Sequence, residues 1–201
     1  WHKIGVIADT HYASIHELPH LVEKFYSICA EEGVVAMLHA GDVFAGDGTV
    51  YRGQLQDLKI IGVDKQVQYV ASVYPMYDFP TYMINGNHDL SVFKTAGVDI
   101  VERLCEIRPD LTYLGKLGGY IDIDGINFYL LHGDAGNPKA RTFKMQQLLD
   151  NMPLEAIPDV FILGHYHVSA HLPSYRGVIG VMPACFEGQG DFLIRKGLYA
   201  E

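Results

Sequence analysis

Cysteines are few in this chain, and they form none of the patterns that cysteine-based sites require. Cys29, Cys105 and Cys185 lie far apart in the 201 residues, and no Cys-x-x-Cys pair is present. An odd number of widely spaced cysteines indicates neither a disulfide framework nor a thiolate metal site. The lack of a disulfide framework favours a cytoplasmic protein.

Basic residues and long apolar runs are also scarce. The chain has 15 Lys and Arg against 24 Asp and Glu, which gives a formal net charge of -9. Phosphate backbones are held mainly by clustered Lys and Arg, so this charge argues against a broad nucleic-acid-binding face. No run approaches the roughly 20 apolar residues that span a bilayer, and the first residues do not resemble a signal peptide. We therefore expect no membrane association.

Apolar residues are plentiful enough for a full core. They make up 49% of the chain, and 201 residues fit one domain better than two. The first residue is Trp1 instead of Met. We therefore expect residues 1–201 to be a single domain, either trimmed at its start or cut from a longer chain.

Strand-like and helix-like segments alternate in the first half of the chain. Compact apolar runs predict buried strands at residues 3–8, 34–38 and 82–84, each followed by a polar loop. Helical spacing of apolar residues predicts helices over 19–32, 64–74 and 98–107. The Gly-rich segment 45–62 is predicted to be an excursion, with partial helix near residues 55–60.

The second half is rich in strands. Asp124-Gly125 lies between the apolar runs 120–123 and 126–131, which is a strong hairpin signal. A helix is predicted over 143–149, and further strands at 160–163, 177–182 and 192–194. Together the two halves predict an α/β (α+β) fold, a four-layer α/β/β/α sandwich of two mixed β-sheets flanked by helices.

Polar side chains of one chemical kind follow five of the apolar runs. They are Asp9 and His11, then Asp42, then Asn87 and His88 in the stretch 85–89, then His132, and finally His165 and His167. Ligands bind at the carboxyl ends of strands in open α/β sheets, so we expect these side chains to converge on one place. Asp-x-His and Gly-Asp are weak signals alone, and Gly-His-x-His is moderately specific. Their convergence carries the prediction.

The number of ligand-type side chains predicts two divalent cations. Two carboxylates, one amide and four histidines are too many for one ion and suit two that share a carboxylate. Two cations, two carboxylates and a bridging hydroxide sum to about +1, which attracts a phosphate ester to this acidic protein. Attack by the bridging hydroxide would then hydrolyse a phosphoester. We expect manganese, with iron, zinc or nickel as alternatives.

The five clusters, in this order, resemble the pattern of the calcineurin-like metallophosphoesterase superfamily. That pattern is Asp-x-His, Gly-Asp, Gly-Asn-His-Asp/Glu, His and Gly-His-x-His, and it is matched from residue 9 to residue 167. The resemblance implies that one cation is held by Asp9, His11 and His167, the other by Asn87, His132 and His165, and that Asp42 bridges them. It also implies that His88 is catalytic and not a ligand. His88 would stabilise the phosphoryl charge or protonate the leaving oxygen.

One departure from the pattern concerns the neighbourhood of His88. Ser/Thr phosphoprotein phosphatases of this superfamily carry an Asp shortly after Gly-Asp, which pairs with the catalytic His, and an Arg that grips phosphate. Ala45 stands where that Asp would fall. Asp89 is a neighbour in sequence that could support the site instead. We therefore disfavour a phosphoprotein phosphatase.

Other residues near the motifs have weaker assignments. His39, Tyr166 and Arg141 are candidates for substrate contact, although His39 and Tyr166 fit a packing role about as well. Lys139, Arg141 and Lys144 are expected to belong to a solvated helix start, and a basic rim for a second phosphate or a nucleic acid strand is the alternative. Asp47, Asp134 and Glu187 are expected to be ordinary loop carboxylates.

Three functions remain open at this point. The leading hypothesis is a phosphodiesterase, either a nuclease or a nucleotide-directed enzyme. Its partner would be a phosphoester substrate, either a nucleic acid or a nucleotide. A phosphomonoesterase is the second hypothesis. A non-enzymatic scaffold with this fold is the third, and it is disfavoured because every expected ligand position is filled.

Overall fold

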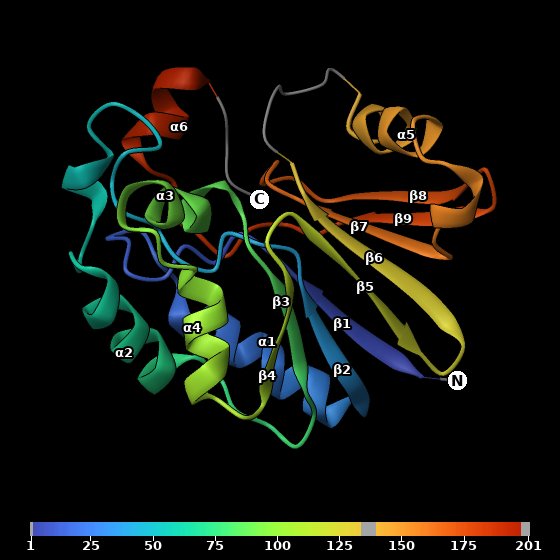
Figure 1. The fold of residues 1–201 in the computed structure, drawn as a ribbon, viewed down its shortest axis with the longest axis horizontal. Coiled ribbons are helices and arrows are strands. Elements are labelled where there is room, and N and C mark those ends of the chain that lie inside the picture. Colours follow the sequence, from blue (N-terminus) through green and yellow to red (C-terminus); the bar gives the residue numbers. More distant parts are fainter. Residues whose placement is uncertain (1, 134–139, 198–201) are drawn as a thin grey trace.

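Two β-sheets packed face to face, with helices on both outer sides, make up the protein (Figure 1). The computed structural model describes residues 2–133 and 140–197. The predicted four-layer α/β/β/α sandwich is confirmed. Within the described residues, no helix is both long and apolar enough to cross a bilayer.

The first sheet is parallel throughout, in the order β1-β2-β3-β4. Its strands are β1 (Lys3–Ile7), β2 (Val34–His39), β3 (Thr81–Ile84) and β4 (Leu111–Gly115). The helices of this half are α1 (Pro19–Glu31), α2 (Val63–Val73), α3 (Asn87–Ala96) and α4 (Ile100–Ile107), with a short 3-10 helix η1 (Gln54–Asp57). The prediction that both sheets are mixed is therefore wrong for this one. Helices connect all its strands, and such connections produce parallel neighbours.

The second sheet is mixed, in the order β5-β6-β7-β9-β8. Its strands are β5 (Gly118–Ile123), β6 (Ile126–His132), β7 (Val160–Gly164), β8 (Ala170–Tyr175) and β9 (Val178–Met182). Helix α5 (Phe143–Asp150), a 3-10 helix η2 (Leu154–Ala156) and helix α6 (Asp191–Lys196) complete the fold. The predicted β5–β6 hairpin is present, with positive φ at Asp124 and Gly125 as its two-residue turn requires.

Alternation along the strands builds the layers. In β7, Ile162 packs with Leu38 of β2 between the sheets, whereas Phe161 and Leu163 pack on the opposite face with Met145 of α5. Side chains of successive strand residues point to opposite faces, so a strand that is apolar throughout is buried on both sides. The outer face of the first sheet is covered in the same way by α1, α2 and α4.

Two local predictions are wrong. The stretch 85–89 is predicted to be a loop, but its last three residues belong to α3, which begins at Asn87. Residues 192–194 are not a strand but lie in α6, which follows Gly190 and ends before Gly197 in the left-handed conformation. Three consecutive apolar residues do not distinguish a strand from a helix, and here the flanking glycines mark the helix ends.

Candidate metal centre

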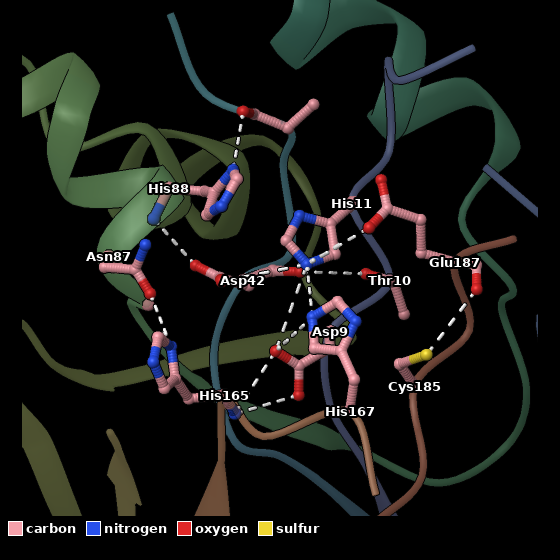
Figure 2. Close-up of polar contacts among 12 residues, drawn as sticks. Asp9, Thr10, His11, Asp42, Asn87, His88, His165, His167, Cys185 and Glu187 are labelled. Atoms are coloured by element: carbon pink, nitrogen blue, oxygen red, sulfur yellow. Dashed lines mark hydrogen bonds and ion pairs between the residues drawn. The ribbon is translucent and has the colours of Figure 1, made fainter. Parts of the chain in front are cut away.

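The predicted ligands meet where the carboxyl ends of β1, β2, β6 and β7 and the start of α3 come together (Figure 2). Both sheets contribute, so the centre lies at the edge of the interface between them. All seven predicted ligand residues are brought to this one place. Their roles as ligands stay predictions.

Asp9, His11 and His167 form the first group. One ligand atom from each lies within 4.8 Å of the others. The Nε2 atoms of His11 and His167 are 3.2 Å apart, and His167 Nε2 is 3.4 Å from Asp9 Oδ1. These three residues are the ones that the superfamily pattern assigns to the first cation.

Asp42, His132 and His165 form the second group, with the same spacing of ligand atoms. Asn87 belongs with them, because its Oδ1 atom lies 3.2 Å from His132 Nε2 and 2.8 Å from His165 Nδ1. Asp42 also faces the first group. Its Oδ2 atom is 3.1 Å from His132 Nε2 and 3.7 Å from His11 Nε2, which is the position of a bridging carboxylate.

The two carboxylates are buried, ionised and surrounded by histidines. Burial alone would raise the pKa of Asp9, but His167 beside it lowers that pKa to about 2. Burial opposes the same effect at Asp42, where His132 and His88 hold the pKa well below its usual range. In turn Asp42 raises the pKa of His132 to about 9, against the effect of burial. Buried carboxylates that need nearby positive charge are suited to divalent cations.

Backbone strain is concentrated at the centre. Asp9, His11, Asp42, His165 and His167 all have positive φ, between 43° and 91°. They are five of the eight non-glycine residues with positive φ in residues 2–133 and 140–197. The left-handed conformation costs roughly 1 kcal/mol for each such residue, so the surrounding fold must stabilise it. Strain of this kind is typical of functional sites.

A glycine allows Asp42 to reach the start of α3. A Cβ atom on Gly86 would lie 2.1 Å from Asp42 Oδ1, so no other residue fits there without a shift. Asp42 Oδ1 accepts a hydrogen bond of 2.8 Å from the backbone N–H of His88, at the positive end of the helix. Gly86 thus allows the loop after β2 to approach the start of α3 closely.

Asp89 holds the loop after β2 against the start of α3. Its hydrogen bonds go to backbone groups and not to the ring of His88. Its carboxylate accepts backbone N–H groups of Val43, Phe44 and Gly86, and so joins the loop after β2 to the start of α3. Burial and the nearby Asp42 raise the pKa of Asp89 to about 8, although these three donors act in the opposite direction.

His132 is oriented from the other sheet. Its Nδ1 atom lies 2.8 Å from the backbone oxygen of Ala40, which can only accept, so Nδ1 carries the proton. Nε2 faces Asp42 and Asn87 and shares a proton with the Asp42 carboxylate, a place that a cation would take. A histidine with one nitrogen bound to a carbonyl and the other facing carboxylate and amide oxygens has the arrangement of a metal ligand. The donor set therefore fits two divalent cations.

His88 lies beside both groups. One of its nitrogens is within 4.8 Å of ligand atoms of His11 and Asp42, and its ring meets the His11 ring edge-on at 4.5 Å. Its Nδ1 atom is anchored away from the ligands, 3.0 Å from the backbone oxygen of Ala45 and 2.8 Å from the amide nitrogen of Gln54.

Two of the three candidates for substrate contact, His39 and Tyr166, are buried. His39 is fully buried, and its ring is 6.4 Å from that of Tyr74, next to the helices behind the sheet. Burial lowers its pKa to about 3, so it is neutral. Tyr166 is buried in the apolar cluster under α5. Both positions favour a supporting role over the predicted contact with substrate.

Of the candidates for a basic rim, Arg141 is exposed and donates to the backbone oxygen of Ser169, shortly after His167. Lys144 donates to Gln147 at 3.5 Å within α5. Lys139 and Asp134 lie outside the described residues.

Two residues that the sequence did not single out for the centre lie beside it. Glu187, expected to be an ordinary loop carboxylate, has Oε2 3.8 Å from His11 Nε2 and Oε1 bound to Ser14 at 3.1 Å. Gln54 contacts His88 from the Gly-rich excursion. No local signal marks either residue, because both reach the centre only through folding.

The two packed sheets and the grouped Asp, Asn and His side chains are typical of metal-dependent phosphoesterases. The family model for calcineurin-like phosphoesterase matches residues 2–195, and the chain belongs to this family. A solved archaeal phosphodiesterase shares the fold, with a TM-score of 0.53 and 18% identity over 90% of this chain and 83% of that one.

Two relatives are DNA polymerase II small subunits. The protein from Methanothermobacter thermautotrophicus is 24% identical over 94% of this chain and 48% of its own length. The protein from Pyrococcus furiosus is 27% identical over 81% of this chain and 32% of its own length. The chain therefore spans less than half of either relative.

Proposed function

We propose that the chain is a phosphodiesterase that acts with two divalent cations. The supporting observation is the convergence of seven ligand-type side chains on one centre in a member of a phosphoesterase family. Asp9, His11 and His167 would hold one cation, Asn87, His132 and His165 the other, and Asp42 both. The mixed oxygen and nitrogen donors accept manganese, iron, zinc or nickel, and manganese is the cation that we would test first.

When bound, two such cations supply Lewis acidity and an activated water for an in-line displacement. The remaining chemistry belongs to the chain. His88, anchored through Nδ1, would present Nε2 to the phosphoryl oxygen or to the leaving oxygen. Asp42 and Asp9, held by the backbone N–H groups of His88 and His165, would keep the centre rigid during the reaction.

Glu187 favours a diester over a monoester as substrate. Its carboxylate lies 3.8 Å from His11 Nε2, and its side chain is only 17% exposed. Glu187 is not among the seven residues assigned to the cations, so its carboxylate would face the substrate. A monoester dianion carries twice the charge of a diester and is repelled more strongly.

Hydrolysis of bis(p-nitrophenyl) phosphate and p-nitrophenyl phosphate by the manganese-loaded protein tests this proposal. We expect faster turnover of the diester, loss of activity with a chelator and recovery on adding metal. A folded, metal-loaded sample that hydrolyses neither compound would overturn the proposal. A faster rate with the monoester would replace it with a phosphomonoesterase.

A subunit role in a DNA polymerase is a second candidate, favoured by the match to two DNA polymerase II small subunits. DNA would then be the substrate or the bound partner, and with a net charge of -9 the chain would depend on a protein partner for most contacts to phosphates. Labelled single-stranded and duplex DNA should be cleaved in a chelator-sensitive reaction. Turnover of small diesters without cleavage of DNA would favour a nucleotide substrate instead.

A further inference from the structure

Gln54 is a buried polar residue that the Gly-rich excursion carries to the centre. It belongs to η1, and only 2% of its surface is exposed. Its amide contacts three groups: the backbone of Val50, the backbone of Ala45 and the ring of His88. Ala45 is the position where related phosphoprotein phosphatases would carry the Asp partner of the catalytic histidine.

Backbone groups fix which way the amide points. Gln54 Oε1 accepts the N–H of Val50 at 2.8 Å, and Gln54 Nε2 donates to the oxygen of Ala45 at 2.9 Å. A backbone N–H can only donate and a backbone oxygen can only accept. Exchanging the two ends of the amide would therefore break both bonds.

The second hydrogen of the amide faces His88. Gln54 Nε2 and His88 Nδ1 are 2.8 Å apart, and a proton on Nδ1 would oppose the amide hydrogen. The oxygen of Ala45 is 3.0 Å from the same Nδ1 and has a second lone pair that could accept a hydrogen bond from it. A proton on Nδ1 would nevertheless leave two nitrogen donors 2.8 Å apart with no acceptor between them. The arrangement is satisfied when Nδ1 accepts and the proton of His88 is on Nε2.

We infer that Gln54 is a positioning residue that holds His88 in the Nε2–H tautomer and directs this N–H into the centre. An Asp partner would accept a hydrogen bond from His88 Nδ1, whereas the Gln54 amide donates a hydrogen bond to Nδ1. The direction of this hydrogen bond is therefore reversed. The N–H at Nε2 can then donate to a phosphoryl or leaving oxygen. The catalytic consequence depends on the proposed phosphoesterase function, but the tautomer does not.

Nitrogen NMR of the histidine rings tests the tautomer directly. The sample is ¹⁵N-histidine-labelled protein loaded with diamagnetic Zn²⁺, and the His88→Ala spectrum identifies the signals of His88. We expect the Nε2–H form in the unchanged protein. The Nδ1–H form there would overturn the inference, whether or not the protein hydrolyses any phosphoester.

Gln54→Met removes the donor while keeping a similar volume. His88 should then donate from Nδ1 to Ala45, and kcat should fall about 10- to 100-fold with KM and metal content unchanged. Gln66→Met is the matched control, because Gln66 is equally buried and holds Gly46 and Ile60 of the same excursion without touching His88. An unchanged tautomer in Gln54→Met, or an equal loss of kcat in both variants, would show that Gln54 only supports the loop.

Discussion

The two sheets contribute unlike parts of the candidate metal centre. The parallel sheet and its connections supply both carboxylates, the amide of Asn87, His11 and His88, whereas the mixed sheet supplies His132, His165 and His167. Each part is oriented by the other. Asp9 accepts the backbone N–H of His165 at 3.0 Å, and His132 donates to the backbone oxygen of Ala40 at 2.8 Å. The centre is therefore a property of the docked sheets and not of either one.

Removing the Asp42 carboxylate should weaken both proposed cation sites at once. We expect Asp42→Asn to lose both cations and to lower turnover by more than about 10³-fold, because Asp42 faces both groups of ligands. Elemental analysis and diester hydrolysis measure the two effects. Asp47→Asn, which alters a partly exposed carboxylate of the same loop, should keep both cations. Full metal content in Asp42→Asn would contradict a bridging role.

His88→Ala should separate catalysis from metal binding. We expect both cations to remain bound while kcat falls about 10²- to 10³-fold, because His88 would act on the substrate and not as a ligand. Metal content and steady-state kinetics of the same preparation give the comparison. Metal loss equal to that of Asp42→Asn would assign His88 to the ligands.

Gly164→Ala should weaken the contact between the two sheets. A Cβ atom there would lie 2.3 Å from Ala40 O, the oxygen that binds His132. We expect metal affinity to fall about 10- to 100-fold, as it does when groups that orient ligands are lost. Gly5→Ala is the control, since its Cβ would meet the flexible end of Met37 on the helix-covered face. Metal titrations that weaken equally in both variants would assign the effect to general destabilisation.

The smallest effect is expected at Glu187. Glu187→Gln removes a fixed charge, so the ratio of monoester to diester kcat/KM should rise about three- to tenfold. Glu106→Gln, which removes an exposed carboxylate on α4, should leave the ratio unchanged. An unchanged ratio in Glu187→Gln would remove this support for a diester substrate.

The sequence by itself determined the elements whose information is local. Apolar periodicity was enough for the early strands, α1 and α2, and Asp124-Gly125 was enough for the hairpin. The convergence of the seven polar residues was also predictable, because polar residues at the ends of buried strands meet at one edge of a sheet. These features depend on residues close together in the chain, and short-range patterns report them well.

Only the tertiary structure decided which neighbours the centre has. The places of Gln54 and Glu187 follow from contacts between distant segments. His11 and Glu187, for example, are separated by most of the chain and lie 3.8 Å apart. Such contacts depend on how whole layers pack together. Residues that meet only through this packing show no periodic pattern in the sequence.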